Sequence, residues 1–280
     1  MSQVRIVSAS QVDTFRTCSL KWHFRHVRKE PERQRAAALV VGSVVDASVK
    51  AAVHAVRDGA SLDAEALFAR AWGDEIGSTQ VPIEWPEKGE EATRATAHDL
   101  VVSFLARPDL KAWVDRVAAV DVRIDLPVVD PRTGREVPDL RLVGVMDLVE
   151  RDEHGKVRPL ELKTAASRAG YDADSLTRHL QLGLYSEALR RMRPDAAPEV
   201  AVDVGLKTKT VAWERRVVTL SDGARRRAVM TVMAVARAMA AGNVYPVSSW
   251  ACSGCPYSGD ICDRWQDAQD ALRILDPFAA

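Results

Sequence analysis

The chain has 280 residues, of which 47% are apolar, so it is long enough to form one large domain or two small ones. Its 39 basic and 39 acidic residues balance to a formal net charge of zero, which excludes a global basic field for attracting nucleic acid. The sequence holds no apolar run of membrane-spanning length and opens on no signal-peptide pattern, so we expect a cytoplasmic protein without membrane contact.

Helical spacing dominates the first third of the chain. The expected helices are an amphipathic one within residues 1–30 with Ser8 or Ser10 as its N-cap, one over 36–58, one from Ser61 or Asp63 to about Trp72, and one that follows a loop at 76–92 and continues through Phe104.

The pattern then changes to the alternation of strands. Strands are expected over 117–129, 139–149, 156–163, 200–206 and 213–220, with helices over about 174–193 and 222–241. The strand at 139–149 is apolar on both faces, which is typical of a strand in the middle of a sheet. This order predicts an α/β or α+β fold in which helices flank a mixed central sheet.

Three neighbouring elements carry side chains suited to phosphodiester chemistry. Asp147 lies towards the end of the central strand, Glu161 and Lys163 share one face of the next strand, and Gln181 and Tyr185 share one face of the following helix. A turn between the two strands brings the carboxylates together beside the lysine. Carboxylates bind hard divalent cations, which polarise a phosphoryl oxygen and lower the pKa of bound water. Each motif alone is most often an ion pair or a turn cap, but the ordered set is more specific.

The cysteines form a second pattern, because one stands near the N-terminus and three stand together near the C-terminus: Cys18, Cys252, Cys255 and Cys262. Four thiolates suit either an iron–sulfur cluster or zinc, and free thiols are the third interpretation. In a reducing compartment a metal site is favoured over disulfides. Such a site would have a structural role and would hold the two ends of the chain together.

Other features have two interpretations each. Lys207 and Lys209 follow the fourth strand and suit either contact with DNA phosphates or a protected sheet edge. Short basic clusters, such as the one at 225–227, are most often solvated helix faces. The tryptophans near the cysteines are expected to pack around the metal site: Trp22, Trp250 and Trp265.

Taken in order, these motifs resemble the PD-(D/E)XK nuclease superfamily over nearly the whole chain. The similarity is to its RecB-like branch with an iron–sulfur cluster, which includes the AddB nuclease domain, CRISPR-associated nucleases of spacer acquisition and phage-encoded relatives. The stretches from Ser8 to Phe15 and from Cys18 to Trp22 are similar to the opening signature of that branch. The resemblance implies one nuclease domain over 1–280, with a mainly helical part at 1–110, a restriction-endonuclease-like core at 115–220, and a C-terminal helix and cysteine cluster at 221–280.

The resemblance also implies a chemistry. The four cysteines would bind a 4Fe–4S cluster that clamps the two termini together. Mg or Mn would be bound by Asp147 and Glu161 with the carbonyl of Leu162, and Lys163 would be the catalytic lysine. Gln181 and Tyr185 would orient the strand. The implied activity is that of a DNA exonuclease acting on single strands or ends.

One position departs from the family pattern. An early helix of these nucleases usually carries a metal-binding histidine in a Gly-Thr-x-x-His segment, and the matching position here is Asp46. We expect Asp46 to be a third metal-binding carboxylate, which favours Mg over softer metals. The same replacement and the neutral net charge motivate an alternative, a catalytically weak or inactive DNA-binding or scaffold protein that keeps the fold and the cluster. A zinc-clamped protein that acts on RNA or is purely structural is the third hypothesis.

Overall fold

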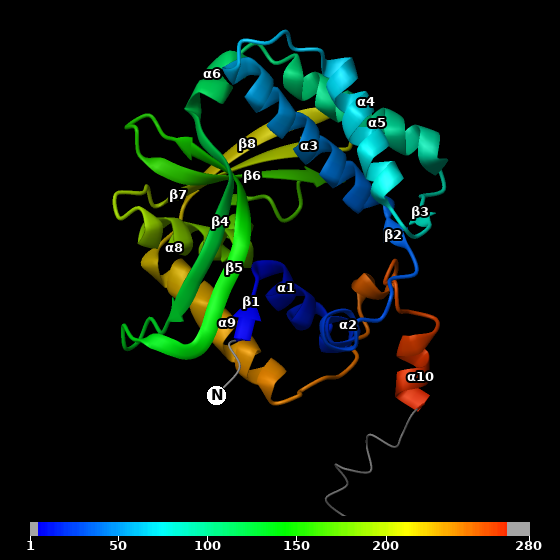
Figure 1. The fold of residues 1–280 in the computed structure, drawn as a ribbon, viewed down its shortest axis with the longest axis vertical. Helices are drawn as coiled ribbons and strands as arrows, with labels where there is room; N and C mark the ends of the chain where they lie inside the picture. Colours follow the sequence, from blue (N-terminus) through cyan, green and yellow to red (C-terminus); the bar gives the residue numbers. More distant parts are fainter. Residues whose placement is uncertain (1–4, 268–280) are drawn as a thin grey trace, which may run out of the picture.

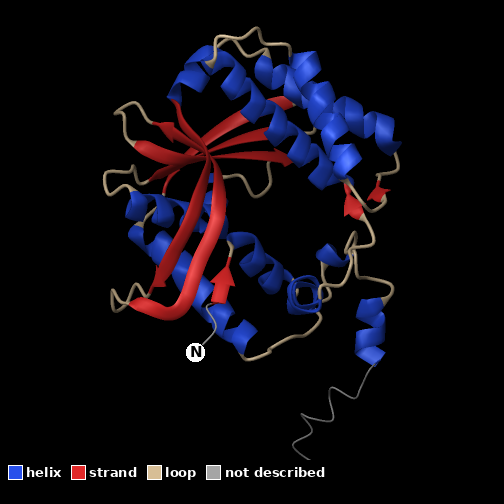
Figure 2. Cartoon of the chain, in the orientation of Figure 1, coloured by secondary structure: helices blue, strands red, loops and turns tan. Residues whose placement is uncertain are grey.

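The computed structural model describes residues 5–267 of the chain (Figures 1 and 2). The helical elements are α1 (Ala9–Thr17), α2 (Ser19–Trp22), a π-helix (His23–Arg28), α3 (Ala37–Arg57), α4 (Ala64–Ser78), α5 (Gly89–Leu105), α6 (Leu110–Arg116), α7 (Ala173–Arg178), α8 (Leu180–Met192), α9 (Asp222–Ala240), a 3-10 helix (Trp250–Cys252) and α10 (Ile261–Asp267). The strands are β1 (Arg5–Val7), β2 (Arg35–Ala36), β3 (Ile83–Glu84), β4 (Val117–Val129), β5 (Glu136–Arg151), β6 (Val157–Ala165), β7 (Glu199–Leu206) and β8 (Ala212–Thr219).

The central sheet is mixed, as the sequence predicts. Its order is β1-β5-β6-β7-β8, and β4 pairs with β5 in addition. The pairs β4–β5, β5–β6 and β7–β8 are antiparallel, whereas β1–β5 and β6–β7 are parallel. β2 and β3 form a small separate sheet. The helices α3 to α6 cover one side of the sheet, and α1, α8 and α9 lie on the other (Figure 1).

β5 changes its partner in the middle of its length. On one edge it pairs with β4 almost throughout, and on the other it pairs with β1 at 140–142 and with β6 at 148–151. Residues 143–147 therefore have no strand partner on that second edge among the described residues. The hydroxyl of Tyr185 donates a hydrogen bond of 2.7 Å to the carbonyl of Val145 in this interval. A side chain thus replaces one of the missing ladder bonds.

Burial along β5 follows from this pairing. The prediction of a central strand is confirmed, since Leu148 and Val149 are 0% and 3% exposed. The expectation that both faces are buried is wrong at Val145, which is 41% exposed, whereas Met146 on the other face of the same interval is 1% exposed.

The helix expected over 174–193 is in fact two helices. The backbone of His179, between α7 and α8, is extended with ψ of 121°. Asp172 caps α7 by accepting from the amide of Ser175 at 2.9 Å. The break lets Leu176 pack into the cluster beneath β7, while Leu184 packs into the cluster beneath β5.

An ion network is buried beneath the sheet. Arg215 in β8 contacts Asp203 at 3.0 Å and also pairs with Glu150, which is 0% exposed. Arg158 lies 2.7 Å from Glu150, and the indole of Trp113 donates to Asp203 at 2.8 Å. Each buried carboxylate therefore has both a cation and a hydrogen bond, as burial of charge requires.

α3 crosses the molecule as a core helix. It is the one helix within residues 5–267 whose length and composition alone would suit a membrane span, a test that core helices also pass. Its apolar face, which includes Val40, Val44 and Val53, packs with α4 and α5. This packing accounts for its hydrophobicity.

Candidate active site

Four of the predicted site residues form one hydrogen-bonded group. Lys163 Nζ lies 2.6 Å from Glu161 Oε1, because the two residues share a face of β6. The Gln181 amide in α8 accepts from Lys163 at 3.1 Å and donates to Glu161 at 3.0 Å. It also donates to the Tyr185 hydroxyl at 3.1 Å. Gln181 therefore fixes the lysine, the glutamate and the tyrosine relative to one another.

A second group of charges adjoins the first. The ammonium of Lys50 in α3 lies 2.8 Å from Asp46, 2.7 Å from Asp121 and 3.1 Å from Asp147. Asp46 and Lys50 are one helical turn apart and so share a face of α3. Asp121 and Asp147 come from the paired strands β4 and β5. Asp121 has φ of 53°, a left-handed conformation that is uncommon for residues other than glycine.

The antiparallel pairing of β5 with β6 brings these groups together. Leu148 is opposite Leu160, so Asp147 and Glu161 are the next residues of the two strands at the point where the ladder ends. The charge of Asp147 contributes to raising the pKa of Glu161. Leu162 lies in the same stretch of β6 with its side chain buried in the α3–α6 cluster, so only its backbone is left for the site.

Burial and like charge dominate the electrostatics. The pKa of Asp46 is raised to about 6: burial is the largest cause, the charge of Asp147 adds to it, and Lys50 opposes both. Burial likewise raises the pKa of Glu161. Burial alone would lower the pKa of Lys163, but the adjacent Glu161 carboxylate outweighs it and the pKa is raised. The carboxylates of the site therefore carry more negative charge than Lys50 and Lys163 together offset.

Two oxygens of this cluster identify where a cation fits. Oδ1 of Asp46 and Oε2 of Glu161 are buried and have no hydrogen-bond partner, although the other oxygen of each carboxylate is paired. Buried unpaired oxygens are costly, and hard divalent ions coordinate such atoms. The donor set thus fits Mg or Mn. Within residues 5–267 no three His, Cys, Asp or Glu side chains are already arranged around a common metal position.

Sequence reasoning missed Lys50 and Asp121. Lys50 was detectable, because it follows Asp46 by one helical turn. Asp121 was not, because its position opposite Asp147 depends on the register between β4 and β5, which alternation alone does not specify.

The four cysteines line one cavity, but among residues 5–267 no three of them surround a common metal position. All four thiols are free, and all four residues line one cavity of about 300 Å³ between the N-terminal helices and the C-terminal segment. Burial raises the pKa of the Cys262 thiol, and the nearby Cys18 and Cys255 raise it further. Four cysteine sulfurs around one cavity are a donor set that suits zinc or an iron–sulfur cluster.

Protein contacts also join the two ends of the chain. The Ser19 hydroxyl donates to the Tyr245 carbonyl at 3.0 Å and accepts from the Tyr245 amide at 2.8 Å. The rings of Phe24 and Tyr257 meet edge to face at 5.5 Å. The blue and orange segments of Figure 1 meet at this point.

The expectation for the tryptophans is wrong in part. Trp265 packs with the small cluster beside the cysteines, and Trp22 packs edge to face on Phe15 at 5.3 Å. Trp250, however, is 87% exposed, because the 3-10 turn that carries it directs the ring away from the cavity.

Comparisons with known proteins agree with this fold. The sequence model of the PD-(D/E)XK nuclease superfamily matches residues 6–263, and the chain belongs to this superfamily. The protein is therefore a nuclease by class, nucleic acid is its class of substrate, and divalent metals such as Mg or Mn are general in the family.

A solved structure of low sequence identity shows the same fold. A crystal structure described as a "Putative exonuclease" from Eubacterium rectale has a TM-score of 0.54 at 15% identity, over 90% of this chain and 87% of that chain. The crystal structure of SSO0001 has a TM-score of 0.36 at 15% identity, over 89% and 92% of the two chains, which is too low to support an argument. No curated protein matches the chain.

Proposed function

We propose that this nuclease is a Mg- or Mn-dependent DNA exonuclease of the RecB-like, AddB-like branch. The observation that carries the proposal is the pair of unpaired buried oxygens, on Asp46 and Glu161, beside the Lys163 ammonium. A carboxylate pair with a neighbouring lysine is a suitable arrangement for phosphodiester hydrolysis. The likeness in fold to a protein named as an exonuclease supports action at strand ends.

Each residue has a distinct role in this proposal. Asp46, Asp147 and Glu161, with the Leu162 carbonyl, would hold the metal, which supplies Lewis-acid polarisation of the phosphate and a more acidic bound water. Lys163 stabilises the negative charge that develops on the phosphoryl oxygens. Its contact with Gln181 keeps the ammonium directed at the reacting group. Tyr185 holds Gln181 and the open stretch of β5 in place.

We further infer a structural 4Fe–4S cluster on Cys18, Cys252, Cys255 and Cys262. The shared cavity and the convergence of both chain ends support it. Iron is favoured over zinc through the resemblance to the iron–sulfur branch. Residues 1–280 would then form a single nuclease unit in the cytoplasm, with the cluster holding its N-terminal and C-terminal parts together.

The cleavage test uses single-residue variants of the intact protein. Asp147→Ala and Lys163→Ala are expected to abolish cleavage of labelled linear DNA with Mg or Mn, whereas Lys156→Ala, in an exposed turn, retains it. Undiminished cleavage by both site variants contradicts the site assignment. Covalently closed single-stranded circles are expected to resist the enzyme, and their rapid loss would indicate an endonuclease.

The cofactor test is independent of cleavage. Anaerobically purified protein is expected to contain iron and acid-labile sulfide and to absorb near 400 nm, and Cys18→Ser is expected to lose both signals. Stoichiometric zinc without iron would instead support the zinc interpretation.

One observation favours the alternative, a catalytically weak DNA-binding or scaffold protein. The Lys50 ammonium already contacts three carboxylates, so an internal cation offsets part of the negative charge that a metal would otherwise offset. Calorimetry with Mn distinguishes the two functions, because an inactive scaffold would show no binding at millimolar metal.

A further inference from the structure

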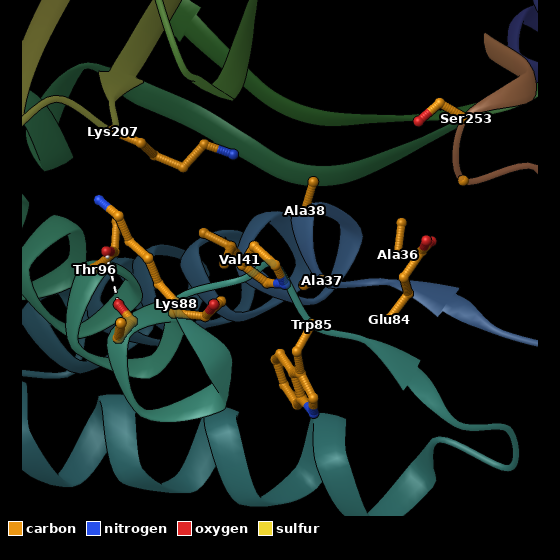
Figure 3. A pocket seen from close by; sticks show the side chains of 14 residues that line it. Ala36, Ala37, Ala38, Val41, Glu84, Trp85, Lys88, Thr96, Lys207 and Ser253 are labelled. Carbon is orange, nitrogen blue, oxygen red and sulfur yellow. Dashed lines mark hydrogen bonds between the residues drawn. The ribbon is translucent and has the colours of Figure 1, made fainter.

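A pocket of about 510 Å³ opens beyond the ends of β6 and β7 (Figure 3). The start of α3 forms one wall, and the first turns of α5 form another. Lys207 and Lys88 come from opposite walls, while Glu84 and Ser253 lie towards the other end. The pocket therefore has a basic end, even though the whole chain carries no net charge.

Neither lysine of this basic end has an acidic partner. Among residues 5–267 no carboxylate forms an ion pair with Lys88 or Lys207, and Glu84 instead accepts a hydrogen bond from Gln34 at 2.8 Å. Lys207 is half-buried, and this burial lowers the pKa of its ammonium. Partial burial of a cation without an anion costs free energy, which a bound anion recovers.

The pocket lies near the candidate active site along the paired strands β6 and β7. Lys163 is opposite Val204 in the β6–β7 ladder, and Lys207 follows three residues later. At about 3.3 Å per residue, that is about 10 Å along the strand. The Lys207 amide donates to the carbonyl of Ala165 at 2.7 Å, so this end of β7 is held against β6.

α3 provides a second connection between the two regions. It carries Asp46 at the site and Val41 at the pocket wall, five residues or about 7.5 Å apart along the axis. Gly42 lies between them, where a Cβ would be 4.0 Å from the Thr164 hydroxyl of β6. α3 thus packs closely on β6 between the carboxylates and the pocket.

We propose that the basic end of this pocket binds the backbone phosphates of a single nucleic-acid strand next to the bond that is cleaved, through Lys207 and Lys88. The proposal rests on the nuclease function proposed above and names a positioning subsite for it. Trp85 lines the same pocket and stacks on Trp72 with ring centroids 6.2 Å apart, which makes a rigid apolar wall for sugars or bases. Because the pocket has a wall on each side, it suits one nucleic-acid strand rather than a duplex.

Binding of a labelled oligothymidine in the absence of divalent metal tests the subsite. Lys207→Gln and Lys88→Gln are each expected to weaken binding about threefold to tenfold, and each is expected to reduce the slope of log K against log salt by about 0.7, the value for one lost contact to a single strand. Lys209→Gln is the matched control, because Lys209 is exposed two residues further on and does not line the pocket. Lys207→Gln is expected to melt at or above the wild-type temperature, so weaker binding cannot be attributed to unfolding.

The outcomes separate the subsite from the catalytic proposal. Wild-type affinity and salt slope in both lysine variants would overturn the subsite, even if the wild-type protein cleaves DNA. Lysine-dependent binding in a protein that cleaves nothing with Mg or Mn would support the subsite and overturn the nuclease mechanism. In an active enzyme Lys207→Gln is expected to raise KM with little change in kcat, and equal affinity for duplex and single strands would contradict the preference for one strand.

Discussion

The ammonium of Lys50 lies 3.1 Å from Oδ1 of Asp147, so an internal cation stands among the carboxylates proposed to bind the metal. The same ammonium contacts Asp46 and Asp121. A metal coordinated by Asp46 and Asp147 would place a second positive charge beside the Lys50 ammonium, which makes this side chain a competitor of the metal.

Lys50→Met is expected to bind Mn at least tenfold more tightly than the wild type, because the competing charge is gone. It is also expected to lower the free energy of unfolding of the metal-free protein by about 2 kcal/mol, the scale for losing hydrogen bonds to charged groups. Calorimetry and urea unfolding measure the two effects. Lys111→Met, which removes an exposed pair with Asp115, serves as the control, and weaker Mn binding by Lys50→Met would contradict the competition.

Asp46→Asn is expected to give a pH-dependent gain in stability without metal. The pKa of Asp46 in the folded protein is about 6, above its ordinary value of 3.8, so ionisation destabilises the fold. The native state binds the extra proton between these values, and stability falls as pH rises from about 4 to about 6. Above that range the variant should be more stable by about 2–3 kcal/mol.

The same titration bears on metal binding. Affinity of the wild type for Mn is expected to fall as pH drops below about 6, because the protonated Asp46 carboxyl is a poor ligand. Urea unfolding of both proteins across this range measures the stability effect, with Asp13→Asn, which alters a half-exposed carboxylate of α1, as control. A stability difference that persists unchanged at pH 4 would contradict the assignment.

Gln181→Met is expected to slow single-turnover cleavage at least tenfold while leaving the affinity for Mn within about threefold of wild type. Gln181 holds the Lys163 ammonium and the paired oxygen of Glu161, but it does not occupy the unpaired oxygen proposed for the metal. A tenfold change in rate corresponds to about 1.4 kcal/mol, within the range of a lost hydrogen bond to a charged group. Tenfold weaker Mn binding with unchanged cleavage would reverse this assignment.

Arg215→Met is expected to lower the free energy of unfolding by about 3–5 kcal/mol, because it leaves Asp203 and Glu150 buried with too little positive charge. Arg216→Met is the matched control: its partner Glu214 is near the surface, and the expected loss is below about 1 kcal/mol. Chemical denaturation measures both. Equal losses in the two variants would show that the buried network contributes little.

The periodicity of the sequence predicted the helices and strands well, but it predicted less well which of them pack against one another. The strand expected over 117–129 coincides with β4, and the caps at Ser8 and Asp63 are present, because alternation and capping are local properties. The break at His179 was missed, because no glycine or proline marks it in the sequence; Leu176 of α7 and Leu182 of α8 pack into one cluster across it.

The candidate site was predictable where its residues share one strand or helix. Glu161 with Lys163, and Gln181 with Tyr185, follow from spacing alone. The contribution of Asp121 depends on strand register, and the basic pocket depends on how α5 and the end of β7 meet. These are long-range relationships that no local pattern encodes.

The change of partner along β5 has a mechanical consequence. β1 and β6 do not pair with each other, so β5 is the element of the sheet that links them, and it does so across the interval 143–147. Asp147 ends that interval and Glu161 stands on the neighbouring strand. The conformation of this short stretch of backbone therefore sets the distance between the two carboxylates. The hydrogen bond from the Tyr185 hydroxyl holds the stretch in place.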